Sequence, residues 1–136
     1  MPRYEAPLRD MRFILNDVLQ LSKYSNLPAF SEMTPDLVDA ILDEGAKFTQ
    51  EVLQPLNYTG DKQGCVRNAD ASVTTPDGFK EAYAKMVEGG WPAITSDPKY
   101  GGQGLPHVVG LAYSEMSSSA NMAFSMYPGL THGCYS

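Results

Sequence analysis

Cysteine, histidine and basic residues are scarce in this 136-residue chain, and each scarcity excludes a class of protein. The two cysteines, Cys65 and Cys134, have no C-x-x-C spacing and no clustered histidine, which excludes a recognisable zinc motif. Ten Lys and Arg stand against 16 Asp and Glu, a net charge of −6. An acidic chain without a basic cluster is a poor binder of nucleic acid or anionic membranes.

Long apolar runs are also missing. No run approaches the ~18 to 20 residues that a membrane-spanning helix needs. The first residues are too few and too polar for a secretory signal, so we expect a cytoplasmic protein with reduced thiols. Hydrophobic residues make up 43% and charged residues 19% of the chain, a composition typical of a globular domain with its own core.

Apolar residues recur at helical spacing along most of the chain. We therefore predict an all-α protein, an up-and-down or orthogonal bundle of about five helices. The predicted helices are Pro7–Leu21, Thr34–Leu53, Thr75–Val87, Pro106–Met116 and a segment that follows Asn121. Thr34 and Asn121 are expected as N-caps, Gly89–Gly90 as a C-terminal stop, and Pro55 as the end of the second helix.

Two segments leave alternatives open. The first helix either packs on its own domain or clamps another domain or subunit, and we favour its own domain. The stretch Leu56–Thr74 is expected to be one long irregular loop, in which a short hairpin is possible. Its Asp61, Asn68 and Asp70 could be read as calcium ligands, but the spacing is not that of an EF-hand, so turn residues are favoured.

The segment Trp91–Pro106 combines the single tryptophan with many Gly and Pro residues. We interpret it as a rigid corner between two helices, pinned by Trp91 and allowed by Gly101, Gly102 and Gly104. Neither common glycine-rich nucleotide motif is met, so a phosphate cradle is disfavoured.

Few residues are placed for catalysis. His107 and His132 are isolated in sequence, and Ser117, Ser118 and Ser119 lack a nucleophile-elbow context. Glu115 is read as an ion-pair partner rather than an acid or base. A stripe of Met, Phe and Tyr from Met122 to Leu130 could line a pocket for an acyl chain, although core packing is the more common role for such a stripe.

Three motifs carry a family resemblance: G-G-W-P-A-I, then D-P-K-Y-G-G-Q-G-L-P, then S-E-M-S-S-S-A-N. Together they resemble the N-terminal helical domain of the flavin-dependent acyl-CoA dehydrogenases, which read "G-W…P-E-x-G-G-x-G-(L/M)" and then "E-E-(L/M)-(A/S)". The opening A-P-L-R-D-M-R-F-I-L-N-D-V-L resembles the extra N-terminal segment of a branch that includes enzymes similar to 3-methylmercaptopropionyl-CoA dehydrogenase.

The resemblance implies a division of the chain and a site. Residues 1–30 would be an N-terminal extension helix, and residues 31–136 the family's N-terminal helical domain, ending before its β domain. By position in the family, the side chains that would face the acyl end of the substrate are Phe124, Tyr127, Pro128, Thr131 and His132. Because Phe124 and Pro128 stand where many fatty-acyl members have polar residues, a short or unusual acyl group is expected.

The resemblance also implies what lies elsewhere. The family's catalytic glutamate and most of its FAD contacts belong to later domains, so no catalytic, metal or identified cofactor residue is assigned in this chain. Since the sequence stops within a helical pattern, we expect a piece of a longer FAD-dependent enzyme that acts on acyl-CoA. We expect the piece alone to be inactive and the full-length protein to be a homo-oligomer. The alternative is a non-enzymatic, acidic helical module for protein interaction.

Overall fold

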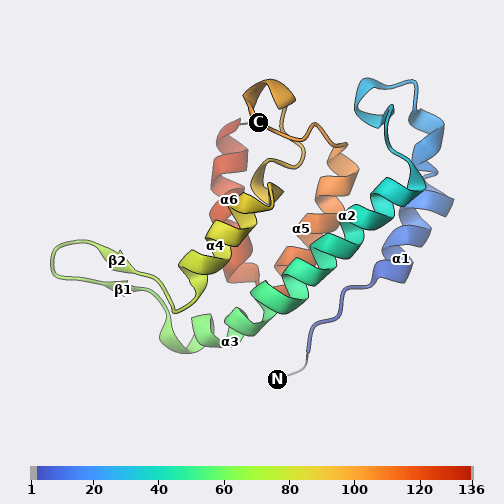
Figure 1. Ribbon diagram of the computed structural model, residues 1–136. Coiled ribbons are helices and arrows are strands. Elements are labelled where there is room, and N and C mark those ends of the chain that lie inside the picture. Colours follow the sequence, from blue (N-terminus) through green and yellow to red (C-terminus); the bar gives the residue numbers. More distant parts are fainter. Residues whose placement is uncertain (1–2, 136) are drawn as a thin grey trace.

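The computed structural model describes residues 3–135, and nearly all of its regular secondary structure is helical (Figure 1). The predicted all-α class is confirmed. The helices are α1 (Leu8–Arg12), α2 (Pro35–Phe48), α3 (Gln54–Gln63), α4 (Phe79–Glu88), α5 (His107–Ala120) and α6 (Met122–Tyr135). Two short strands, β1 (Val66–Arg67) and β2 (Val73–Thr74), complete the fold. The first two residues of the predicted extension, and residue 136 at the end of the predicted domain, lie outside the described residues.

The second helix does not end at Pro55, so that prediction is wrong. A π-helical turn over Thr49–Leu53 joins α2 to α3, and Pro55 lies in the first turn of α3. Proline lacks a backbone N–H, but the wider π turn changes which N–H groups meet which carbonyls just before it. The helical path therefore continues to Gln63, and the expected irregular loop is wrong for its first half.

The second half of that stretch forms a hairpin. Strands β1 and β2 pair antiparallel, with Val66 opposite Thr74 and Arg67 opposite Val73. The connecting turn is held by its own side chains, because Asp70 accepts hydrogen bonds from the backbone and side chain of Ser72. Asn68 donates to Ser72 and Thr74 across the hairpin. This geometry fits the favoured interpretation of Asn68 and Asp70 as turn formers, whereas Asp61 lies in α3, so the turn prediction is wrong there.

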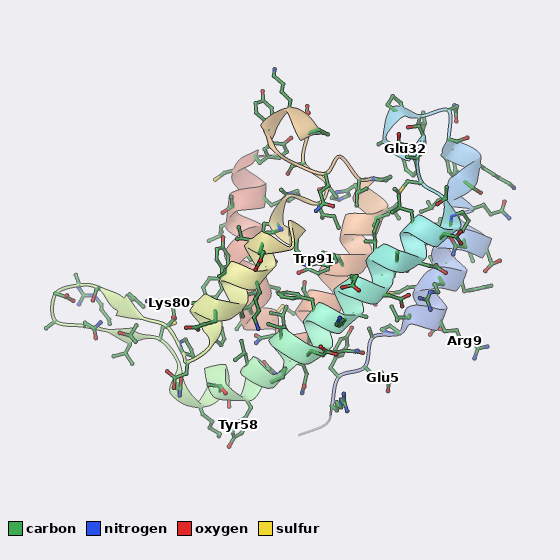
Figure 2. The ribbon with its side chains drawn as sticks, in the orientation of Figure 1. Glu5, Arg9, Glu32, Tyr58, Lys80 and Trp91 are labelled. Atoms are coloured by element: carbon green, nitrogen blue, oxygen red, sulfur yellow. The ribbon has the colours of Figure 1, made fainter. Side chains whose placement is uncertain are left out.

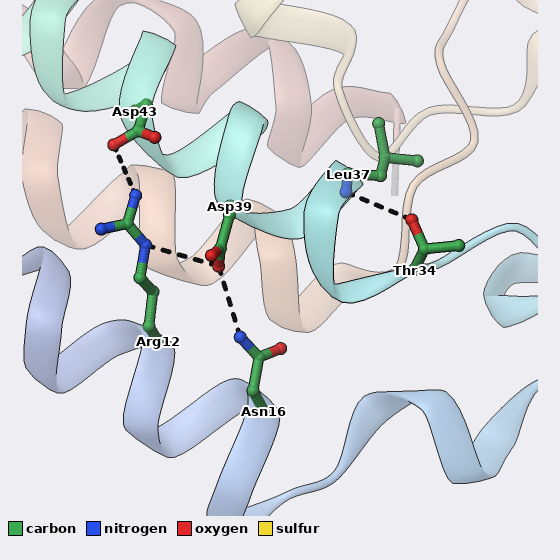
Figure 3. A network of polar contacts seen from close by, with 6 residues as sticks. All are labelled: Arg12, Asn16, Thr34, Leu37, Asp39 and Asp43. Atoms are coloured by element: carbon green, nitrogen blue, oxygen red, sulfur yellow. Dashed lines mark hydrogen bonds and ion pairs between the residues drawn. The ribbon is translucent and has the colours of Figure 1, made fainter.

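The N-terminal helix packs on α2 through a mixed apolar and polar contact. Met11 and Leu15 are buried, and Arg12 forms ion pairs with Asp39 at 3.4 Å and Asp43 at 2.6 Å (Figure 3). Asn16 donates to the same Asp39 carboxylate at 3.3 Å. Partly exposed ion pairs of this kind contribute about 0 to 1 kcal/mol each, so burial of the two apolar side chains stabilises the contact more than the ion pairs do.

The predicted apolar face of this helix is only partly correct, because Ile14, Val18 and Leu19 are exposed. A π-helical turn over Phe13–Val18 shifts the stripe, so Met11 and Leu15 face α2 while the other apolar residues lie outside the contact. The helix thus packs on its own domain through one face, and its second apolar face lies on the surface of this chain.

The core lies where α2, α4, α5 and α6 meet. Its largest fully buried side chains are Phe124, Leu42, Leu53, Met86 and Met116. The helices α2 and α5 approach closely at Gly45, where an added Cβ would lie 2.9 Å from the Met116 side chain. Helix α4 begins at Phe79 after the left-handed Gly78, so the start expected at Thr75–Asp77 is a few residues too early. Its end at Gly89–Gly90 is confirmed, with Gly90 at φ 72°.

Within residues 3–135, no helix has the length and hydropathy needed to cross a bilayer.

Candidate functional site

The corner between α4 and α5 is built around Trp91, as predicted. The indole stacks on Tyr113 of α5 with ring centroids 4.4 Å apart and lies 6.3 Å from the Phe48 ring of α2. Figure 2 shows Trp91 in the space between α4 and the two helices α2 and α5. The Trp91 side chain therefore connects α5 and α2 just after the end of α4, and this stacking fixes where the following loop begins.

The glycines of the corner allow close backbone approach rather than anion binding. A Cβ at Gly102 would overlap the carbonyl of Ser96, and Gly101 and Gly104 have φ of 84° and 67°. The loop's N–H groups donate to its own carbonyls, Gln103 to Ala93 at 3.0 Å and Gly104 to Ser96 at 2.9 Å. Since these donors are occupied, the geometry gives a phosphate cradle no support.

A cavity of about 230 Å³ lies beside this corner, between α5 and α6. Apolar side chains dominate its wall, and hydroxyl and imidazole groups are spaced among them. The lining residues are Met86, Trp91, Pro92, Ile94, Thr95, His107, Gly110, Leu111, Tyr113, Ser114, Ser117, Ser125, Pro128, Gly129 and His132. An apolar pocket with a few polar groups is the usual form of a small-molecule site, and this cavity is our candidate site.

The structure brings together only part of the predicted acyl site. Pro128 and His132 line the cavity. Phe124 lies in the core with none of its surface exposed, and its ring packs against Phe79 at 5.7 Å. Tyr127 lines a different depression with Thr75, Phe79, Lys80 and Tyr83. Thr131 is exposed and lines neither of these hollows, so the roles of all five residues stay predictions.

The sequence patterns considered above missed the wall that α5 contributes. Gly110, Ser114 and Ser117 recur at spacings of four and three residues, which places three small residues on one helical face. Such a face leaves room beside the helix, and all three line the cavity. This spacing was the available signal, but the sequence interpretation takes up only Ser117 of the three, as a nucleophile candidate, and leaves Gly110 and Ser114 out.

Burial sets the protonation of the tyrosines near the two hollows. Burial raises the pKa of Tyr113 well above the usual value for a phenol. Burial raises the pKa of Tyr127 as well, with a further contribution from the neighbouring Cys65. Both side chains are therefore neutral hydrogen-bonding groups at physiological pH.

Neither Glu115 nor His107 shows the surroundings of a catalytic group. Both are exposed on α5, and the charge of Glu115 adds to the effect of burial in raising the pKa of Tyr4. Glu115 is in none of the ion pairs among residues 3–135, so its predicted role as an ion-pair partner is wrong. Among residues 3–135, no three His, Cys, Asp or Glu side chains gather where a metal could bind. The cavity can therefore bind and orient a molecule, and the absence of a catalytic residue from this chain stays a prediction.

Comparison with known proteins gives relatives across nearly the whole chain. A 3-methylmercaptopropionyl-CoA dehydrogenase of Ruegeria pomeroyi is 38% identical over 130 residues, which cover 96% of this chain. A butyryl-CoA dehydrogenase of Syntrophomonas wolfei is 32% identical over 133 residues. A broad-specificity linear acyl-CoA dehydrogenase of Mycobacterium tuberculosis is 30% identical over 130 residues. No family model matches the chain.

The chain spans about a fifth of the length of these relatives, 22%, 22% and 21% respectively. This relation is consistent with a piece of an acyl-CoA dehydrogenase, and the resemblance seen in the sequence motifs is confirmed.

Proposed function

From this chain's place in the acyl-CoA dehydrogenase family, we propose that it is the N-terminal helical part of an FAD-dependent enzyme that introduces a Cα–Cβ double bond into an acyl-CoA thioester. Bound FAD would accept the β hydride in that reaction. The residues described here do not fit FAD on their own, because the glycine-rich corner uses its N–H groups internally and the cavity is too small for a dinucleotide. The flavin and the catalytic base would come from the rest of the protein.

The observation that carries this proposal is the apolar cavity between α5 and α6. Its volume of about 230 Å³ exceeds the ~150 Å³ of a cavity known to hold benzene, which suits a short acyl group. Each buried methylene contributes about 0.8 kcal/mol of binding, so a few methylenes supply useful affinity. Pro128 and His132 would form the α6 wall, and Gly110, Ser114 and Ser117 the α5 wall.

The first test is made on the full-length protein encoded by the same gene. We expect stoichiometric FAD in the purified protein and acyl-CoA-dependent reduction of an electron-accepting dye. The 136-residue chain alone is expected to bind little flavin and to show no turnover. A full-length protein without flavin and without acyl-CoA oxidation would refute the proposal.

The second test asks whether this cavity holds the acyl group. Ser114→Leu places a larger side chain in the lining and should lower kcat/KM for the longest accepted acyl-CoA about 10- to 200-fold, while propionyl-CoA, the shortest acyl-CoA with a Cβ, changes little. Ser119→Leu is the matched control, because Ser119 is exposed on the same helix and does not line the cavity. Equal effects of both variants on all chain lengths would place the acyl group elsewhere.

A second function, binding of a partner protein, is favoured by the exposed apolar side chains of α6. Met122, Met126 and Leu130 are 63%, 65% and 80% exposed. In the enzyme, we propose that the remaining domains of the same protein, or another subunit of a homo-oligomer, cover them. The short chain should then self-associate or bind an apolar dye, whereas the full-length protein should not. A 136-residue chain that is monomeric and does not bind the dye would instead support the interaction module.

The cytoplasmic location stays a prediction, which cell fractionation can test.

A further inference from the structure

A second hollow, of about 310 Å³, lies between the start of α4 and α6. We call it the α4 hollow; its lining residues are Thr75, Phe79, Lys80, Tyr83 and Tyr127. Figure 2 shows Lys80 at the end of α4 nearest the β-hairpin, with Trp91 beyond the other end of that helix. The α4 hollow shares no lining residue with the cavity between α5 and α6, so it is a separate place for a ligand.

Two partly exposed tyrosine rings form the walls of the α4 hollow. Tyr83 and Tyr127 are 38% and 39% exposed, so a ligand can reach both rings. The Tyr127 ring stands edge-on to Phe79, with centroids 6.1 Å apart and an interplanar angle of 89°. Phe79 is itself buried against Phe124 and forms a fixed floor. None of the ring contacts among residues 3–135 includes Tyr83, so its ring is available for stacking with a flat molecule.

The charge of the α4 hollow favours a negatively charged occupant. Lys80 is exposed and takes part in none of the ion pairs or cation–π contacts among the described residues. None of the five lining side chains is a carboxylate, so the Lys80 ammonium is the charge that an occupant meets there. Aromatic walls alone would also suit an organic cation, but an ammonium in the same hollow repels one.

We propose that the α4 hollow binds a small, flat aromatic carboxylate, whose ring lies between Tyr83 and Tyr127 and whose carboxylate meets the Lys80 ammonium. The ion pair selects the acid over an aromatic alcohol or amine, and stacking on the tyrosines selects it over a saturated acid. Because Tyr83 belongs to α4 and Tyr127 to α6, the bound ring would hold the two helices together. The inference does not rest on the proposed function, since binding here needs neither flavin nor turnover.

The test uses the full-length protein and four ligands of similar shape. These are naphthoate, its saturated analogue decahydronaphthoate, the neutral naphthylmethanol and the cationic naphthylmethylammonium. Isothermal titration calorimetry gives dissociation constants for wild type, Lys80→Met and Tyr83→Ala. Lys85→Met is the matched control, because Lys85 is exposed on the same helix and does not line the α4 hollow.

We expect wild type to bind naphthoate more tightly than the alcohol and the saturated acid, and to bind the ammonium least. Lys80→Met should weaken naphthoate binding about 3- to 10-fold and change the affinity for the alcohol by less than about twofold. Tyr83→Ala should weaken both about 3- to 10-fold, because it removes a stacking wall. Lys85→Met should change neither affinity. Naphthoate should also raise the Tm of wild type more than that of Tyr83→Ala.

Three results would overturn the inference: no binding of naphthoate, tighter binding of the ammonium, or equal effects of Lys80→Met and Lys85→Met. Naphthoate held instead in the cavity between α5 and α6 would give the last of these results and would compete with acyl-CoA. Failure here is distinct from failure of the proposed reaction. A protein that oxidises no acyl-CoA can still bind naphthoate at Lys80, and an active enzyme can lack this binding.

Discussion

Helices α5 and α6 are adjacent, equally long and both rich in apolar residues, yet they bury very different parts of their surfaces. Helix α5 buries Val109, Tyr113, Met116, Ser117 and Ala120, whereas α6 buries only Phe124 among its described residues. The difference follows from their neighbours. Helix α5 lies between α2, the Trp91 corner and α6, while α6 contacts α5, α3 and the Trp91 corner and meets α4 through Phe124 and Phe79 (Figure 1).

This comparison separates hydrophobicity from burial. An apolar side chain stabilises the fold only when another element covers it, and α6 presents more apolar surface than this chain covers. The same composition therefore supports folding in α5 and leaves α6 with surface for a ligand, for further domains or for another subunit.

The largest loss of folding stability is expected at Phe124, the side chain of α6 that is buried among the described residues. Phe124→Ala should lower the free energy of unfolding by about 3 to 5 kcal/mol, because it removes a fully buried ring packed on Phe79. Leu130→Ala should change it by less than about 0.5 kcal/mol, since Leu130 is exposed. Urea denaturation of the 136-residue chain measures both values. Similar losses would mean that α6 is buried along its whole length.

A smaller loss of folding stability is expected at Asn121, between α5 and α6. Asn121 is buried, accepts a hydrogen bond from the Phe124 backbone at 3.0 Å and donates to the Leu53 carbonyl at 3.1 Å. Asn121→Ala should cost about 2 to 3 kcal/mol, from a lost N-cap and an unpaired buried carbonyl. Asn121→Ser keeps a capping oxygen and should cost roughly half as much. Equal losses for Ala and Ser, by urea denaturation, would show that the cap contributes nothing.

The smallest change in folding stability is expected only at high pH. It is tested on one tyrosine of each helix, Tyr113 of α5 and Tyr127 of α6. Burial raises the pKa of Tyr113 above that of an unfolded tyrosine, which titrates near 10. The neutral Tyr113 phenol contributes its full stabilisation below about pH 10. This stabilisation is lost as the pH rises further, because the tyrosine ionises first in the unfolded state. Relative to Tyr113→Phe, wild type should lose about 1 kcal/mol between pH 9 and 11. Wild type should lose less relative to Tyr127→Phe, since Tyr127 is more exposed. Urea midpoints at both pH values measure this, and the reverse order would contradict it.

Local signals in the sequence predicted much of the fold. Thr34 caps α2 by accepting the Leu37 N–H, and Asn121 caps α6, as their residue types indicate. The Gly89–Gly90 stop and the Trp91 corner were also predictable from composition. Pro55 was misjudged, because the π turn that accommodates it depends on backbone geometry that no single residue signals.

The site was less predictable, because its residues meet only after folding. Phe124 packs on Phe79, which lies 45 positions earlier, and no local pattern distinguishes this core contact from a pocket wall. Only the small residues Gly110, Ser114 and Ser117 gave a local indication of the cavity.

The contact between Gly102 and the Ser96 carbonyl bears on which natural variants this corner can tolerate. At Gly101, which has a positive φ and open space around it, asparagine or aspartate is a tolerable replacement. At Gly102 the φ is not positive, but any Cβ would meet backbone that cannot rotate away. During sequence evolution, position 102 should therefore keep its glycine while position 101 varies. The φ angles alone would suggest the opposite, because only Gly101 has a positive φ.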